Sequence, residues 1–197
     1  MTERSESHSL LSVARGRLPR ATWFSIPQTE LIPRITLLFG FSFLFLTLHV
    51  LDDAFVTGEP GWYGISISEF LVYLLLIFGI VPPLGLYLAR RGSRWGFGIL
   101  LLYALQAFYG AGLNHIRHLM GDFRGSQVLP TLLQWLDIQI GDTRGHGIFS
   151  LLAGMAGLTG VPPHSHSLAS TLVVFVSVGV NLVLIGLLAL ALVGKRE

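Results

Sequence analysis

The sequence has no cysteine among its 197 residues. This absence excludes disulfides, thiolate metal sites, iron–sulfur clusters and cysteine nucleophiles. Charged residues are also scarce, because they make up 12% of the chain, whereas they form roughly a quarter of an ordinary soluble domain. Since 52% of the residues are apolar, the composition excludes a soluble globular domain and predicts an integral membrane protein.

Several motifs with a defined chemistry are missing as well. The sequence contains no glycine-rich phosphate loop, no Gly-x-Ser-x-Gly nucleophile elbow and no dinucleotide fingerprint. It therefore gives no support to nucleotide-dependent phosphoryl transfer or to classical serine hydrolysis. Its basic residues, twelve arginines and Lys195, form no continuous stripe, so we expect no nucleic acid as a partner.

Long hydrophobic runs are what the sequence has in abundance. A transmembrane helix needs about 20 mostly apolar residues. Runs of this kind predict membrane spans at about 35–51, 67–89, 95–115 and 168–193. We therefore predict an all-α integral membrane bundle of four transmembrane helices, forming a single domain over residues 31–197 after a polar, basic tail over residues 1–30.

Two further stretches are too short or too polar to be predicted as spans. Residues 147–161 would form a helix shorter than a hydrocarbon core of about 30 Å. We expect a short re-entrant or interfacial helical segment there, with a fifth span as the alternative. Residues 128–140 place their leucines on one side, which is typical of an interfacial amphipathic helix or of an extramembrane helix packed on the bundle.

The basic residues predict an orientation in the membrane. With four spans, ten of the 13 basic residues lie on the side of the chain ends, against Arg117, Arg124 and Arg144 opposite. The positive-inside rule then places both termini in the cytoplasm. We expect the lipid bilayer as a partner, with anionic lipids facing the basic side. Histidines cluster on the opposite, outer side: His49, His115, His118, His146, His164 and His166.

The first candidate group for chemistry is His49-Val50-Leu51-Asp52-Asp53, at the outer end of the first span. On a helix, His49 and Asp53 are four residues apart and share a face. This spacing predicts half of a metal site, or a carboxylate that orients a histidine. The alternative is that the two aspartates only mark the exit of the helix into water.

The second candidate group lies at the outer end of the third span. Asn114, His118 and Asp122 recur every four residues, with His115 beside them, so a helix would align them in one polar stripe. Ionisable residues at this depth usually face the bundle interior. We expect Arg117 to reach the interface or to pair with an outer acid. The alternative is an ordinary amphipathic helix end.

Three further positions could complete a site on the same face. Glu69 opens the second span, and His146 opens the short segment. His164 and His166 follow a Pro-Pro turn, and we interpret them as part of a solvated loop, with weak metal binding as the alternative.

Imidazoles and carboxylates gathered on one face are the ligands of zinc, iron or manganese. We predict a divalent metal site with His49, Asp53, His118 and His146 as ligands, and with Asp52, Glu69 and His115 in catalytic roles. Zinc with an open position lowers the pKa of bound water to about 7. The corresponding activity would be metal-dependent hydrolysis of a lipid or another amphiphile.

Two other functions fit the same residues. A histidine pair such as His49 and His118 could bind haem or line a quinone pocket. Alternatively, Gly154, Gly157 and Gly160 would let a helix pack closely against a partner, as in a non-enzymatic membrane subunit or assembly factor.

The motif of the first span resembles that of a family of integral membrane proteins named for the pattern His-x-x-Glu-Glu. Here the pattern reads His49-Val50-Leu51-Asp52-Asp53, with aspartate in place of both glutamates. The resemblance implies a multi-helix membrane protein in which paired acids and histidines mark a site, and it implies no particular reaction. By analogy, the architecture is also similar to small membrane hydrolases of lipid amides that gather histidines and an aspartate around zinc, although their full motif is absent.

Overall fold

The computed structural model describes residues 28–124, 147–157 and 159–194. Within these ranges the chain is helical and contains no strand. Four helical stretches are long and apolar enough to cross a membrane: Glu30–Thr57, Ile67–Arg90, Arg94–Leu119 and Leu168–Val193. The predicted all-α bundle with four helices of spanning length is therefore confirmed.

Three of the four stretches are not regular α-helices, because each contains a π-helical turn. The first consists of α1 (Gln28–Asp52) and η1 (Asp53–Thr57). The second joins α2 (Ile67–Leu74), η3 (Leu75–Ile80) and α3 (Val81–Arg90). The third joins α4 (Arg94–Phe108), η4 (Tyr109–Asn114) and α5 (His115–Leu119). The fourth is α8 (Leu168–Val193), which is α-helical throughout.

Pro82 and Pro83 lie in the first turn of α3, directly after the π-helical turn η3. Proline is tolerated at this place because the first turn of a helix needs no backbone N–H donor. The second stretch therefore stays helical through both prolines.

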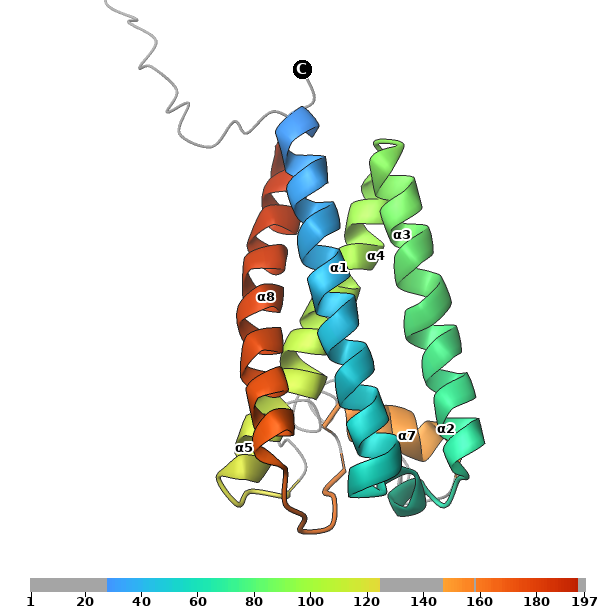
Figure 1. The fold of residues 1–197 in the computed structure, drawn as a ribbon. Coiled ribbons are helices and arrows are strands. Elements are labelled where there is room, and N and C mark those ends of the chain that lie inside the picture. The colour runs from blue at the N-terminus through green and yellow to red at the C-terminus, as the bar shows by residue number, and fades with distance from the viewer. Residues whose placement is uncertain (1–27, 125–146, 158, 195–197) are drawn as a thin grey trace, which may run out of the picture.

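The long helices pack as an antiparallel bundle (Figure 1). The most extensive contacts join α1 to α8, α3 to α4 and α4 to α8. Close packing of α3 against α4 depends on Gly96, where a Cβ atom would lie 2.6 Å from the carbonyl oxygen of Gly85. The start of α1 and the end of α8 lie at the same end of the bundle (Figure 1). There the guanidinium of Arg94 donates a hydrogen bond to the carbonyl of Leu192 at 2.7 Å. We call this end the arginine end.

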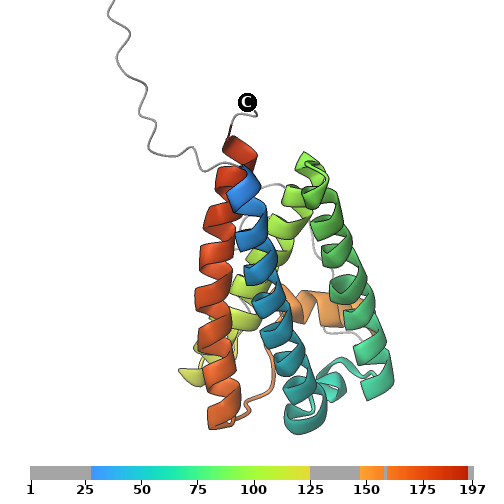
Figure 2. The same ribbon diagram turned by 45° about the horizontal axis from the view of Figure 1, so that its top comes forward.

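The short helix α7 (Ile148–Met155) lies at the opposite end and runs across the long helices (Figures 1 and 2). Its eight residues extend about 12 Å, well short of a hydrocarbon core. The prediction of a short helical segment is thus confirmed, and this helix cannot be a fifth span. Its position is fixed by a backbone hydrogen bond from Gly147 to the carbonyl of Tyr63. Residues 1–27 of the predicted tail lie outside the described residues. The whole of the predicted helix over 128–140 lies outside them as well.

A polar network lies inside the bundle between α1, α4 and α8. The Ser42 hydroxyl donates to the side-chain oxygen of Asn181 at 2.7 Å and lies 3.0 Å from the hydroxyl of Tyr103. The amide of Asn181 donates to the carbonyl of Ser177. Because Ser42 has one proton and gives it to Asn181, the Tyr103 hydroxyl is the donor to Ser42. Hydrogen bonds of this kind join helices within membranes. We call these four residues the central network.

Candidate metal centre

A buried group of His49, Asp53 and His115 lies at the end of the bundle opposite the arginine end. Their exposed fractions are 4%, 5% and 9%. His49 Nε2 lies 3.2 Å from Asp53 Oδ2, and His115 Nε2 lies 4.0 Å from Asp53 Oδ1. Two ligands of a tetrahedral zinc ion are about 3.3 Å apart when each is about 2.0 Å from the metal. The three residues, which we call the inner triad, therefore need only small shifts to share one ion.

The helix geometry explains why His49 and Asp53 meet. The chain stays helical beyond α1 because it continues in η1, whose first residue is Asp53. The two side chains are therefore still one turn apart on one face, as their spacing predicts. Turns of π-helix are frequent at functional sites.

The π-helical turn η4 fixes the ring of His115 from the other side. His115 Nδ1 lies 3.2 Å from the carbonyl oxygen of Gly110, which belongs to that turn. A carbonyl oxygen can only accept a hydrogen bond, so Nδ1 carries the proton of the neutral ring. The lone pair is then on Nε2, the nitrogen that faces Asp53. Such a hydrogen bond to a carbonyl is the usual way in which proteins orient a metal-binding histidine.

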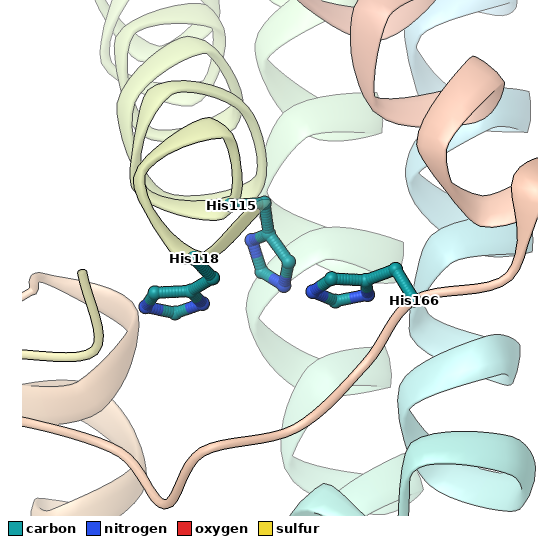
Figure 3. A group of neighbouring side chains, drawn as sticks. All are labelled: His115, His118 and His166. Carbon is teal, nitrogen blue, oxygen red and sulfur yellow. The ribbon is translucent and has the colours of Figure 1, made fainter. Parts of the chain in front are cut away.

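His115 also belongs to a second group, with His118 and His166 (Figure 3). His118 follows one turn later on α5, and His166 comes from the segment that precedes α8. Their ligand atoms all lie within 4.8 Å of one another. Figure 3 shows the ring of His115 between the other two rings. We call this group the outer triad.

His166 is half-buried and lies beside His164, with the two Nε2 atoms 3.0 Å apart. Burial, together with the charge of His164, lowers the pKa of His166 to about 4. Its ring is therefore neutral at physiological pH, which is the form that binds a metal ion.

Several atoms of the two triads have no hydrogen-bond partner among the described residues. They are His49 Nδ1, Asp53 Oδ1, His118 Nδ1 and His166 Nδ1. Buried polar atoms are nearly always paired in folded proteins, so each such atom calls for an explanation. A bound cation would satisfy Asp53 Oδ1 and those of these ring nitrogens that carry the lone pair of a neutral imidazole. The donor set of imidazole nitrogens and one carboxylate fits zinc, iron or manganese.

Glu59 is a site residue that the sequence analysis missed. It is buried in the short helix η2 (Glu59–Tyr63), and its Oε1 accepts a hydrogen bond from the hydroxyl of Tyr63 at 2.8 Å. Burial, followed by the negative charge of Asp53, raises the pKa of Glu59 to about 8. Burial also raises the pKa of Tyr63, which keeps that residue a hydrogen-bond donor. A proton-carrying carboxyl thus lies next to the inner triad.

The inner triad and Glu59 line a cavity of about 50 Å³. His118 and Asn114 also line it, and buried apolar side chains of α1, α2 and η3 form another part of its wall: Leu46, Phe70, Leu74 and Phe78. A volume of this size holds a few water molecules. It is too small for a porphyrin, so the described structure does not favour the haem alternative.

The remaining predicted residues divide into those near the triads and those elsewhere. Asp52 is half-buried at the end of α1, and its Oδ2 has no partner among the described residues. Glu69 is exposed and caps α2, because it accepts hydrogen bonds from the backbone and hydroxyl of Ser66 at 2.7 Å each. The structure therefore does not bring Glu69 to the cavity. His146 lies outside the described residues.

The predicted polar stripe on the third span is only partly realised. Asp122 lies beyond the end of α5 and pairs with Arg117 at 2.8 Å and with Arg124 at 3.0 Å. These arginines lower the pKa of the Asp122 carboxyl. Arg117 thus pairs with an outer acid, as expected, and Asp122 is held away from the triads.

The structure also divides His115 and His118 differently from the prediction, which had His118 as the ligand beside His49 and Asp53. In the structure His115 takes that place, and His118 belongs to the outer triad. The physical reason is η4, because a π-helical turn adds a residue and changes which side chains face α1.

Family models, curated proteins and solved structures were all compared with this chain, and none matched.

Proposed function

We propose that this protein binds one divalent transition-metal ion in the inner triad and uses it to hydrolyse an amphiphile. The observation that carries the proposal is a buried ligand set with unpartnered atoms that opens on a cavity with an apolar wall. Three protein ligands would leave a coordination position open, as in catalytic zinc sites. Zinc in such a site lowers the pKa of a bound water to about 7.

The residues around the triad support hydrolysis. Glu59 lies beside Asp53 and within the same cavity, so its ionised form is placed to take a proton from water and to return it to a leaving group. The Tyr63 hydroxyl holds the Glu59 carboxyl in place. Tyr63 is therefore a positioning residue, and Glu59 replaces Glu69 as our candidate for the general base.

The apolar wall indicates the class of substrate. Leu46, Phe70 and Leu74 border the same cavity as the metal ligands, so the carbon atoms next to the polar bond can lie against them while that bond reaches the triad. A cavity of about 50 Å³ admits a reacting group and not a whole lipid, since sites for complete small molecules occupy about 300–1,000 Å³. We infer an ester or amide at the end of an acyl chain.

The family resemblance and the orientation stay predictions. The inner triad contains the first and last residues of the motif His49-Val50-Leu51-Asp52-Asp53. This agrees with a family in which that motif marks a site. The proposed orientation puts both termini in the cytoplasm, with the triads at the outer face.

The first test is metal analysis of detergent-purified protein. Wild type should contain about one equivalent of zinc, iron or manganese, and His49→Ala and Asp53→Asn should lose most of it. Asp122→Asn is the matched control, since it removes a carboxylate at the same end that pairs with Arg117 and Arg124 and belongs to neither triad. Metal content that is the same in all four proteins would contradict the proposal.

The second test is hydrolysis of a synthetic acyl ester and acyl amide in detergent. Activity should disappear with a chelator and return with metal. Glu59→Gln should lower kcat by about 10²–10⁴-fold, the usual contribution of a general base, whereas Glu69→Gln should behave like wild type. Bound metal without any hydrolysis would restrict the function to metal binding, and the absence of both would favour a packing or partner-binding subunit.

A further inference from the structure

The two triads share His115, and this has a consequence for how many ions can be bound. Its Nδ1 donates to the carbonyl of Gly110, so only Nε2 has a lone pair. The same Nε2 faces Asp53 in the inner triad. The ring of His115 also lies between those of His118 and His166 (Figure 3), and because Nδ1 is protonated, Nε2 is the nitrogen that it can offer to an ion in the outer triad as well. One lone pair binds one ion, so the two triads cannot both be complete at the same time.

The two positions differ in charge. The inner triad includes the carboxylate of Asp53, with Glu59 beside it. The outer triad consists of three histidines and includes no acid. The charges near His118 are those of Arg117 and its ion-pair partner Asp122, and Asp52 acts on His166 from outside the triad. A carboxylate that itself binds the ion attracts a divalent cation more strongly than neutral imidazoles do. The inner position therefore holds an ion more strongly.

The two positions also differ in access. His49 and Asp53 are 4% and 5% exposed, whereas His166 is half-buried and belongs to a segment with exposed residues on both sides. The outer triad is therefore the part of the site that an ion from solution meets first.

We propose that the outer triad is the access position of the metal centre, and that His115 Nε2 passes a single divalent ion from His118 and His166 to His49 and Asp53. The ion stays bound to one histidine throughout the transfer, so it is never released into the apolar interior. This inference rests on the proposed function, because it assumes that the inner triad holds the ion at equilibrium.

The unpartnered ring nitrogens support this role. His118 Nδ1 and His166 Nδ1 are buried without a partner among the described residues. His164 Nδ1 lies 2.8 Å from the carbonyl of Pro162 and must donate to it, so its neutral ring accepts at Nε2. His166 then donates from its own Nε2, and its lone pair is on the unpartnered Nδ1. The outer triad thus has a free lone pair available for an ion in transit.

Cobalt(II) uptake by metal-free, detergent-purified full-length protein tests the inference. Equilibrium titration gives the number of ions bound, and the visible absorption of cobalt reports its ligands. Stopped-flow absorption then gives the rate of uptake. The variants are His166→Ala, His118→Ala and His49→Ala, and the control is Glu69→Gln, which removes an exposed carboxylate that caps α2.

We expect one equivalent of cobalt in wild type. His166→Ala and His118→Ala should still bind one equivalent, with a spectrum like that of wild type, but uptake should be at least about tenfold slower, as for partners that support a metal site. His49→Ala should hold its cobalt in the outer triad, with a changed spectrum and weaker binding. Glu69→Gln should take up cobalt at the wild-type rate.

Three results would overturn the inference. Two equivalents in wild type would show that the triads are independent. Unchanged uptake rates in both His118→Ala and His166→Ala would remove the access role while the inner site stands. Complete loss of cobalt in these two variants, with an unchanged spectrum in His49→Ala, would place the ion in the outer triad. No cobalt binding by wild type would refute the proposed function itself.

Discussion

Two groups of polar side chains lie within the bundle, and they differ in how their hydrogen bonds are arranged. In the central network, the side chains of Ser42, Tyr103 and Asn181 all find partners across α1, α4 and α8. In the two triads, four buried atoms lack partners among the described residues: His49 Nδ1, Asp53 Oδ1, His118 Nδ1 and His166 Nδ1. The first group is complete as it stands, and the second is complete only with a ligand.

This difference separates a structural role from a functional one. Burying a polar group without a partner costs roughly 1–3 kcal/mol, so a chain that leaves several such atoms in one place must gain something from them. The central network joins helices, whereas the triads present lone pairs to a cavity. Substitutions in the two groups should therefore affect different properties, stability in one case and metal binding in the other.

The largest effect is expected from His115→Ala. His115 is the one residue common to both triads, so its loss leaves no complete ligand set. Metal affinity should fall by more than about 100-fold, beyond the 10–100-fold loss typical of supporting residues, which corresponds to about 2.7 kcal/mol. Competition with a chelator of known affinity measures this change.

Tyr103→Phe is the matched control for His115→Ala, since it removes one hydroxyl from the central network. It should bind metal like wild type. Equal losses of metal in the two variants would mean that metal binding reports general packing and not the triads.

The second-largest effect is a pH dependence of stability that arises from Glu59 and His166, at the end of the bundle that contains the triads. The pKa of Glu59 is about 8 in the folded protein against 4.5 normally, so between these values the folded state holds a proton that the unfolded state has lost. Stability from this group therefore falls as pH rises toward 8. His166, with a folded pKa of about 4 against 6.5, acts in the opposite direction, and its contribution is complete above pH 6.5.

Between pH 6.5 and 8, metal-free protein should consequently unfold at temperatures that drop by several degrees as pH rises. Thermal unfolding in detergent measures this slope. Glu59→Gln should reduce it, because the neutral amide does not titrate. Glu69→Gln should leave it unchanged, because the exposed Glu69 carboxylate accepts hydrogen bonds from Ser66 and stays ionised throughout this range. An unreduced slope in Glu59→Gln would assign the titration to another group.

A smaller effect is expected from Asn181→Leu, which should lower stability without affecting metal binding, the reverse of His115→Ala. The substitution keeps the branching of the side chain at Cγ but leaves the Ser42 hydroxyl without its acceptor. The free energy of unfolding should decrease by ~1 kcal/mol, within the range measured for hydrogen bonds between membrane helices, and metal content should stay at the wild-type level. Chemical unfolding and metal analysis on the same sample check both parts. Loss of metal in this variant would show that the two groups are coupled.

The sequence was sufficient for those features that depend on local spacing. Hydrophobic runs predicted four helices of spanning length, and the four-residue spacing predicted that His49 and Asp53 would meet. Both properties follow from the periodicity of a helix and need no knowledge of the tertiary fold.

The rest of the site depends on tertiary structure. Glu59 and Glu69 are alike in sequence, yet Glu59 is buried because the chain turns back at Gly58, where φ is +75°, whereas Glu69 is a helix cap. His166 comes from a loop that only the placement of α8 brings to His118. His115, and not His118, lies with His49 and Asp53. This follows from the π-helical turn η4, which no sequence pattern here indicated.

The smallest effect is expected from Asp122→Asn, and it defines where the site ends. Asp122 lies at the same end as the triads, but its side chain is one-third exposed and both its oxygens are bound by Arg117 and Arg124. Ion pairs in contact with water contribute little to stability. The variant should therefore match wild type in metal affinity and should unfold at nearly the same temperature. If instead it bound metal more weakly, negative charge anywhere at this end would be enough to attract the ion, and the precise ligand geometry of the triads would matter less than their position.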